Sequence, residues 1–307
     1  MTDPANNFRQ GLWRLADPKI SLASFAGIFL AACFAARDVG LDTGWLLLTW
    51  MGVFLVEVAK NASGEVVDFD SGTDLAIAEE ERSPFSGGKR VLVDGLLDRN
   101  QAWWIAGTCF LAAIMIGLAI VVLRDSRVLV FGLAGMSLAW FYHGGPVRLS
   151  YRGLGELAVA IAYGPVIVLG TYLVQAGAFN AILVQLSIIL GILVAAFLWI
   201  NQFPDFRADR ESGKRNLVVR LGPARSALAY VLLVVSAYLW LALLVFGDPA
   251  AGMIWPAFAG LFPALFSAGR MLSYGGRIQA LVPAQAAALM SFLLTSAGAG
   301  LGYLLMT

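Results

Sequence analysis

Long apolar runs separated by short polar segments make up most of this chain of 307 residues. Nine runs are long enough, or nearly so, to cross a bilayer, which takes about 20 residues in a helix. They lie at roughly 20–36, 44–63, 102–123, 128–142, 154–174, 181–203, 226–246, 251–271 and 281–305. The period-two alternation of a membrane barrel strand is absent from these runs. The pattern predicts an all-α, polytopic membrane protein with about nine transmembrane helices.

Composition supports this assignment to the membrane class. Hydrophobic residues make up 59% of the chain and charged residues 13%, whereas about 25% of the residues of a typical soluble protein are charged. We therefore expect a single integral-membrane domain over residues 1–307 that is surrounded by the lipid bilayer. The formal net charge of +1 gives no indication of nucleic-acid binding. Gly132, Gly135 and Gly191 are candidates for close contacts between helices.

The distribution of basic residues predicts the orientation of the chain. Of the 21 lysine and arginine residues, only Arg37, Arg124 and Arg127 lie on the outer side when the N-terminus is placed in the cytoplasm. Cytoplasmic segments carry an excess of basic residues in membrane proteins. We therefore expect a cytoplasmic N-terminus in a bacterial or archaeal inner membrane. The amphipathic segment 6–19 is expected to lie on the membrane surface.

Acidic residues concentrate in two of the predicted cytoplasmic segments. Nine of the 20 acidic residues lie between Glu65 and Asp98, and three lie between Asp205 and Glu211. The first segment follows the second apolar run and the other follows the sixth. We therefore expect these segments to face each other at the cytoplasmic end of a helical bundle.

The later segment begins NQFPDFRADRESGKRN and places Asn201, Asp205 and Asp209 at i, i+4 and i+8. On a helix that continues from the sixth span, these residues share one face, with a kink expected at the intervening proline. Like charges at this spacing repel, and a bound Mg²⁺ ion is the simplest explanation. Lys214 and Arg215 follow in positions suited to phosphate oxygens. A solvated helix end with cytoplasmic basic residues explains the spacing equally well.

The earlier segment reads NASGEVVDFDSGTD and places Asn61, Glu65 and Asp68 at i, i+4 and i+7. This spacing again puts the three side chains on one helical face, and Asp74 follows beyond a glycine. Carboxylate and amide oxygens at a helix end are suitable ligands for Mg²⁺.

A glycine-rich segment, RSPFSGGKR, follows at residues 82–90 and contains the cations Arg82 and Lys89. Such a backbone can fold closely around a phosphate group. Two acidic clusters with nearby cations, each at the end of an apolar helix, predict a diphosphate bridged by Mg²⁺. The apolar part of that substrate would lie between the helices.

Three stretches of the chain resemble the UbiA superfamily of intramembrane prenyltransferases. Within it they are similar to the MenA-type enzymes, which prenylate 1,4-dihydroxy-2-naphthoate. NQFPDFRADRESGKRNLVVRLG (201–222) resembles the second aspartate motif of that branch. YHGGPVRLSYRGLGELAVAIAYGPVIVLGTYLVQ (142–175) resembles its Tyr-x-Gly-Gly-Pro and Tyr-Arg-Gly-Leu-Gly-Glu segment. GEVVDFDSGTD (64–74) fits the first motif, usually Asn-Asp-x-x-Asp with a later Gly-x-Asp. The nine-span count also fits, so the resemblance covers most of the chain.

The resemblance implies Mg²⁺-dependent transfer of a polyprenyl group from an allylic polyprenyl diphosphate to an aromatic acceptor. The acceptor of the most similar branch is 1,4-dihydroxy-2-naphthoate, in menaquinone biosynthesis. The implied metal ligands are Glu65, Asp68 and Asp74 for one ion and Asp205 and Asp209 for the other. The resemblance also implies a catalytic role for four of these residues: Asp68, Asp205, Asp209 and Glu65. The implied substrate-binding residues are Asn61, Arg82, Lys89, Tyr142, His143, Tyr151, Arg152, Asn201, Lys214 and Arg215.

Some positions depart from the family pattern. Gly64 stands where the first motif has asparagine, and Asn61, one turn earlier, is a candidate to supply the missing amide. His143 stands where a smaller polar residue is expected. It is either a base or acceptor contact, or an interfacial histidine without a chemical role. The departures leave open a UbiA-type prenyltransferase or cyclase with a different acceptor. A transporter would place its ionisable residues near the bilayer midplane, whereas these acids lie at one surface.

Overall fold

The computed structural model describes residues 4–305, which are nearly all helical. Within this range no β-strand forms, and there is only an isolated bridge between Ser83 and Ser86. Eight helical segments are long and apolar enough to cross a membrane. Val128–His143 is a shorter apolar helix that occupies the place of the ninth predicted span. The predicted all-α membrane architecture is confirmed.

The described residues contain nine apolar helical segments in chain order. They are α2 (Pro18–Asp38), α3 (Thr43–Asp70), α4 (Arg99–Leu123), α5 (Val128–His143), the continuous α6 (Gly155–Ile161), η3 (Ala162–Val166) and α7 (Ile167–Ala176), α8 (Ala181–Asn201), α11 (Pro223–Gly247), η4 (Pro249–Gly260) with α12 (Leu261–Leu272), and α13 (Val282–Leu305). The remaining elements are short: α1 (Pro4–Ala16), η1 (Glu79–Glu81), η2 (Leu149–Tyr151), α9 (Phe206–Glu211), α10 (Leu217–Leu221) and η5 (Ile278–Ala280).

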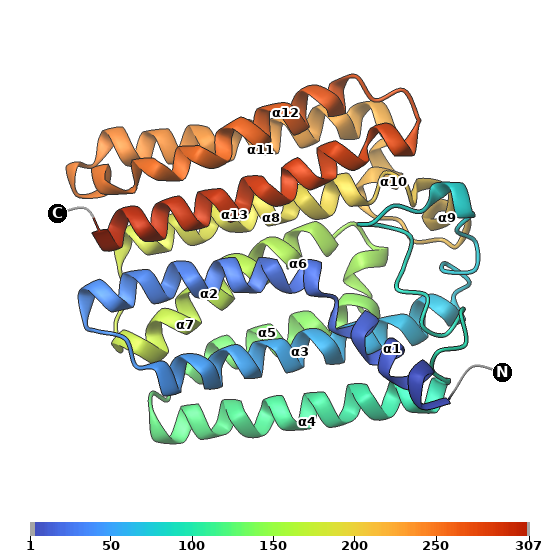
Figure 1. The fold of residues 1–307 in the computed structure, drawn as a ribbon, viewed down its shortest axis with the longest axis horizontal. Coiled ribbons are helices and arrows are strands. Elements are labelled where there is room, and N and C mark those ends of the chain that lie inside the picture. Colours follow the sequence, from blue (N-terminus) through green and yellow to red (C-terminus); the bar gives the residue numbers. More distant parts are fainter. Residues whose placement is uncertain (1–3, 306–307) are drawn as a thin grey trace.

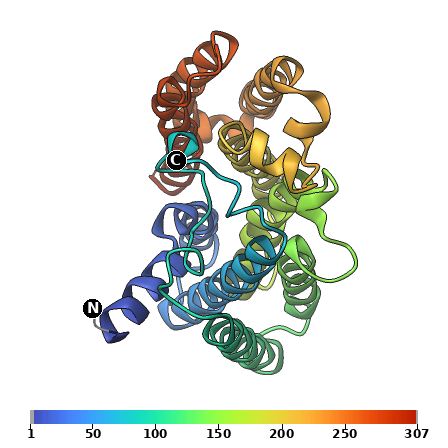
Figure 2. The same cartoon turned by 90° about the vertical axis from the view of Figure 1, so that its right-hand side faces the viewer.

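The long connections between the spans lie at one end of the bundle, on the right in Figure 1, together with α1. We call this end the loop end. The connections there are residues 71–98, 144–154, 202–222 and 273–281. Figure 2 looks onto the loop end and shows the helices arranged around a centre that the segment between α3 and α4 crosses. Both acidic segments of the sequence therefore lie at the same end of the molecule.

A polar cluster ties the helices together at the opposite end. Asp38 accepts hydrogen bonds from the hydroxyls of Tyr172 at 2.6 Å and Tyr303 at 2.7 Å and from the Asn180 amide at 3.0 Å. Phe34 stacks on Tyr303, with ring centroids 3.6 Å apart. These contacts join α2, α7, α13 and the start of α8. These four segments are therefore fastened to one another at the end that lies away from the loops.

Close helix packing positions α8, which leads into the second acidic segment. A Cβ atom on Gly191 would overlap the carbonyl oxygen of Ala160, and one on Gly164 would overlap that of Ser187. The expected close contact at Gly191 is therefore confirmed. In contrast, a Cβ on Gly132 would have no atom within 4 Å, and one on Gly135 would meet only Val166 at 3.5 Å.

We predict that Gly191→Ala lowers the free energy of unfolding by about 1–3 kcal/mol, because the added methyl group meets backbone that has to move apart. Gly107→Ala is the matched control, since a Cβ on this exposed residue of α4 meets nothing within 4 Å. The measurement is the thermal unfolding midpoint of the purified protein in detergent. Equal midpoints for the two variants would contradict the packing described here.

Candidate active site

A polar cavity of about 800 Å³ lies at the loop end of the bundle. The glycine-rich segment and the first residues of α2 form part of its wall. Both acidic segments contribute to it, through Asp68, Asp74, Asp205, Asp209 and Lys214. The structure therefore brings together side chains that are up to 146 residues apart in the sequence.

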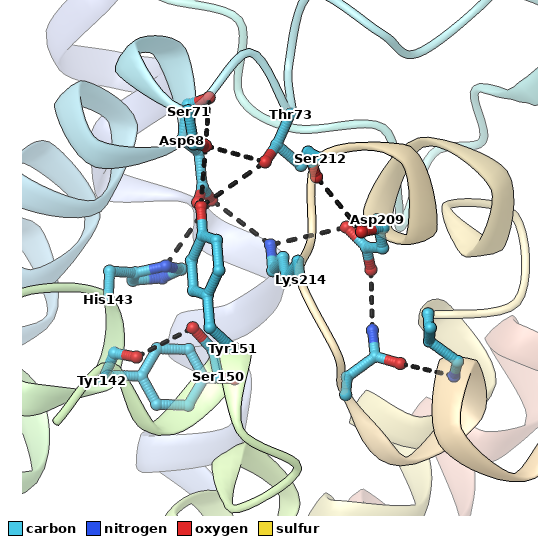
Figure 3. Close-up of polar contacts among 12 residues, drawn as sticks. Asp68, Ser71, Thr73, Tyr142, His143, Ser150, Tyr151, Asp209, Ser212 and Lys214 are labelled. Carbon is cyan, nitrogen blue, oxygen red and sulfur yellow. Dashed lines mark hydrogen bonds and ion pairs between the residues drawn. The ribbon is translucent and has the colours of Figure 1, made fainter.

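Lys214 lies between the two acidic segments (Figure 3). Its Nζ is 3.4 Å from Asp68 Oδ2 and 3.7 Å from Asp209 Oδ1, and only 16% of its side chain is exposed. Burial by itself lowers the pKa of this lysine. The nearby carboxylates outweigh burial and raise the pKa well above its usual value, because an opposite charge at short distance favours the charged form. Lys214 is therefore a buried ammonium group shared by two carboxylates.

Asp68, in the last turn of α3, is held by side chains from other elements. The Tyr151 hydroxyl donates a hydrogen bond to Asp68 Oδ1 at 2.7 Å, and the Ser71 and Thr73 hydroxyls lie 2.8 and 3.4 Å from the same tyrosine oxygen. His143 Nδ1 lies 3.5 Å from Asp68 Oδ2 (Figure 3). These contacts fix one carboxylate at the cavity wall.

The second acidic segment is not one continuous helix. Helix α8 ends at Asn201 and α9 begins at Phe206, with a turn between them that contains Pro204. The break follows from proline, which removes a backbone donor. Asn201, Asp205 and Asp209 all line the cavity, but they do so from a helix end, a turn and a short helix instead of from one helical face.

Asp209 and Asp205 differ in the hydrogen bonds that their carboxylate oxygens accept. Asp209 Oδ2 accepts from the Asn216 amide at 2.7 Å, whereas Asp205 Oδ1 and Asn201 Oδ1 are buried without a hydrogen-bond partner. Burial, followed by the charge of Asp209, raises the pKa of Asp205 to about 8. Burial likewise raises the pKa of Asp209 to about 6. Burial, followed by the charge of Asp68, raises the pKa of Asp74 to about 8.

Burial is the main cause of these raised pKa values, so a bound cation would favour the charged form of these carboxylates. The acidic groups are spread around the wall: among residues 4–305, no three His, Cys, Asp or Glu side chains are close enough to hold a metal ion by themselves. Hard oxygen donors fit Mg²⁺, which is commonly bound by one or two carboxylates together with substrate phosphates. The arrangement therefore suits an ion that arrives with a diphosphate.

The other residues named from the sequence fall into two groups by position. Those that line the cavity are Asn61, Arg82, Lys89, Tyr142, His143 and Asn201. Those that do not line it are Glu65, Tyr151, Arg152 and Arg215. Of the second group, Tyr151 reaches the site through its hydrogen bond to Asp68.

Glu65 and the two arginines have other contacts. Glu65 Oε1 accepts from the backbone N–H groups of Val91 and Leu92 and so holds the end of the glycine-rich segment against α3. Arg152 is exposed and donates to the carbonyl of Pro146 at 2.9 Å. Arg215 is also exposed, and its backbone N–H donates to the Tyr151 carbonyl at 3.1 Å. The predicted metal-binding role of Glu65 stays a prediction.

The two departures from the motif pattern contact each other. A Cβ atom on Gly64 would lie 2.6 Å from Cδ2 of His143, so the imidazole ring occupies the space beside this glycine. Asn61 does not fill that space, because its amide donates to the Leu15 carbonyl at 2.8 Å and ties α3 to α1. A side chain at position 64 would require His143 to move away from Asp68.

Sequence analysis missed two ionisable residues inside the second span. Lys60 lines the polar cavity, and Glu57 Oε2 accepts from the Ser21 and Ser24 hydroxyls at 3.1 and 3.2 Å. Ionisable residues at membrane depth are by themselves a signal of function, so this signal was available in the sequence. The role of Asn216 in holding Asp209 was not, because it depends on how the loop folds.

Comparison with known proteins identifies relatives of the whole bundle. Residues 25–293 match the UbiA prenyltransferase family. The chain is 27% identical to the 1,4-dihydroxy-2-naphthoate octaprenyltransferase of Bacillus subtilis, over 81% of this chain and 78% of that protein. It is 32% identical to the 2-carboxy-1,4-naphthoquinone phytyltransferase of Synechocystis sp., over 58% of this chain and 55% of that protein.

Solved structures share the fold. A UbiA homolog from Aeropyrum pernix aligns with a TM-score of 0.64 at 19% identity, over 91% of this chain and 96% of that one. A UbiA homolog from Archaeoglobus fulgidus bound to GPP and Mg²⁺ aligns with a TM-score of 0.60 at 13% identity, over 93% and 99%. The family match extends over most of the spans and both acidic segments. The chain therefore belongs to the UbiA prenyltransferase family and is a membrane-embedded prenyltransferase.

Proposed function

We propose that the chain transfers a polyprenyl group from an allylic polyprenyl diphosphate to 1,4-dihydroxy-2-naphthoate, with Mg²⁺, at the cytoplasmic side of the membrane. The observation that carries the proposal is the position of Lys214 between Asp68 and Asp209, where both acidic segments meet in one cavity. The named function of the Bacillus subtilis relative supports the acceptor. The homolog bound to GPP and Mg²⁺ supports the donor and the metal.

The residues of the cavity fit magnesium. Asp205 Oδ1 and Asn201 Oδ1 are buried oxygen atoms without partners, and a cation would satisfy them. We assign Asp68 and Asp74 to one side of the metal site and Asp205 and Asp209 to the other, with diphosphate oxygens completing the ligand set. When bound, Mg²⁺ withdraws charge from the diphosphate and makes it a better leaving group.

The side chains of the cavity act on the diphosphate end of the donor. Lys214 inside the cavity, with Arg82 and Lys89 on its wall, supplies positive charge where negative charge develops as the C–O bond breaks. Phe85 packs edge-on against Phe197 at a centroid distance of 6.0 Å, and both line the cavity. Aromatic faces stabilise a nearby cation, and these two rings are our candidates for shielding the allylic carbon from water.

Prenyl transfer breaks the C–O bond of the donor and forms a C–C bond to the acceptor. The diphosphate leaves with the electron pair of the C–O bond, and the allylic carbon becomes bonded to a ring carbon of the acceptor. The ring carbon then loses its carboxylate as CO₂, and the electron pair of that broken C–C bond restores the aromatic ring. No net proton or redox partner is needed.

Asp205→Asn is expected to lower the rate of prenyl transfer by about 100-fold or more, because a carboxylate that would hold the Mg²⁺ ion beside the leaving diphosphate is lost. The assay uses purified protein in detergent with labelled geranylgeranyl diphosphate, 1,4-dihydroxy-2-naphthoate and Mg²⁺, and measures the prenylated product. EDTA should abolish the reaction. Glu80→Gln, at an exposed position, is the control and should keep full activity.

The products of this assay distinguish 1,4-dihydroxy-2-naphthoate from other possible acceptors. If diphosphate is released but no prenylated naphthol forms, the proposed metal site is supported and the acceptor is a different molecule. Full activity of Asp205→Asn, or activity in EDTA, would contradict the proposed metal site.

Lys214→Met is expected to destabilise the metal-free protein by about 3–5 kcal/mol, because it leaves two buried carboxylates without a counter-charge. Added Mg²⁺ should restore more of the lost thermal stability in this variant than it adds to the wild type. Arg225→Met, which removes an exposed charge in the first turn of α11, serves as the control. Identical Mg²⁺-induced shifts of the unfolding midpoint in Lys214→Met and wild type would contradict the shared-charge role of Lys214.

A further inference from the structure

A second cavity, of about 200 Å³ and mostly apolar, adjoins the polar one. It lies among α3, α4, α5 and the continuous segment from α6 to α7, within the membrane-spanning part of the bundle. Four residues, Lys60, Tyr142, Val159 and Tyr163, line both cavities. A group bound at this junction would therefore lie beside the reacting end of a donor in the polar cavity.

Glu57 brings an unsatisfied acceptor to the wall of the second cavity. Its side chain is buried, with the residue 6% exposed. Oε2 accepts from two serine hydroxyls, whereas Oε1 has no partner with hydrogen-bond geometry, although the Tyr163 hydroxyl is nearby. Leaving a buried polar atom unpaired costs free energy. A ligand hydroxyl that donates to Oε1 would remove this cost.

Lys60 carries the complementary charge one turn further along α3. Its Nζ lies 5.4 Å from the centre of the Tyr142 ring. Within the described part of the chain it forms no ion pair. Residues three apart share a helix face; Lys60 lines both cavities, and Glu57 lines the apolar cavity next to it. Lys60 is therefore an ammonium group available to a ligand anion.

From this pair we infer that the junction is the acceptor subsite, and that Glu57 and Lys60 select an aromatic acid with a hydroxyl group beside its carboxylate. The hydroxyl donates to Glu57 Oε1, and the carboxylate accepts from Lys60 Nζ. The ring lies against Tyr142 and the apolar wall. A hydrocarbon chain at this position would leave both polar groups unsatisfied, which favours the acceptor over the prenyl tail. The inference rests on the proposed function for the identity of the reaction.

Direct binding tests this subsite without requiring turnover. The ligands are 1-hydroxy-2-naphthoate, 1-naphthol and 2-naphthoate, which differ in which of the two polar groups they carry. They are titrated into purified protein in detergent, without donor or Mg²⁺, by isothermal titration calorimetry. The wild-type protein should bind 1-hydroxy-2-naphthoate most tightly of the three.

Each variant should affect only the ligands that carry its partner group. Lys60→Met is expected to raise the Kd of the two carboxylates by about tenfold, the loss of one charged hydrogen bond, and to leave 1-naphthol unchanged. Lys60→Arg should restore most of the affinity. Glu57→Gln should weaken the two hydroxylated ligands and leave 2-naphthoate unchanged. Arg99→Met, which removes an exposed charge with 57% of its side chain accessible, is the control for net charge.

Several outcomes would overturn the subsite. They are no measurable binding of 1-hydroxy-2-naphthoate to the wild type, an unchanged Kd in Lys60→Met, or equal weakening of all three ligands. Weakened binding of geranylgeranyl diphosphate with Mg²⁺, and not of the naphthoates, would assign Lys60 to the donor instead. A different result would contradict the proposed function alone. In that case the wild type prenylates no aromatic acceptor, but Lys60→Met still weakens binding of 1-hydroxy-2-naphthoate.

Discussion

Repulsion among buried carboxylates is the constraint around which this structure is organised. Four aspartates from two distant segments face one cavity, where charges interact more strongly than in water. Burial, followed by this repulsion, raises the pKa values of Asp74 and Asp205, and Lys214 relieves part of the repulsion. The carboxylates keep their positions through neutral donors, the Tyr151 hydroxyl and the Asn216 amide. The rest of the bundle has to bring the ends of α3 and α8 together and hold them there.

The features predicted well from the sequence are those that depend on local pattern. Hydropathy located the spans to within several residues, because each helix must satisfy its backbone within the membrane. Helical spacing also placed Asn61 and Asp68 of α3 on one face, and both line the cavity. Length alone does not identify every membrane span. Helix α5 occupies the place of a span, but its 16 residues are fewer than the about 20 that a span normally needs.

Contacts between distant segments could not be read from local pattern. Spacing placed Glu65 on the same helical face as Asp68, but it carried no information that the backbone of Val91 and Leu92 would occupy its carboxylate. For Arg152 and Arg215, charge and proximity to a motif did not indicate that their side chains turn outward. The contact between Gly64 and His143 is of the same kind: two unusual residues, far apart in the sequence, are explained by each other only in three dimensions.

The hydrogen-bonded cluster around Asp38 also makes the two ends of the bundle mechanically unequal. At that end, hydrogen bonds and a ring stack join α2, α7, α13 and the start of α8. At the loop end, long connections surround the cavity instead. Separating the helices at the fastened end would break these hydrogen bonds, which costs free energy. We therefore expect any change in bundle width that accompanies binding to be concentrated at the loop end.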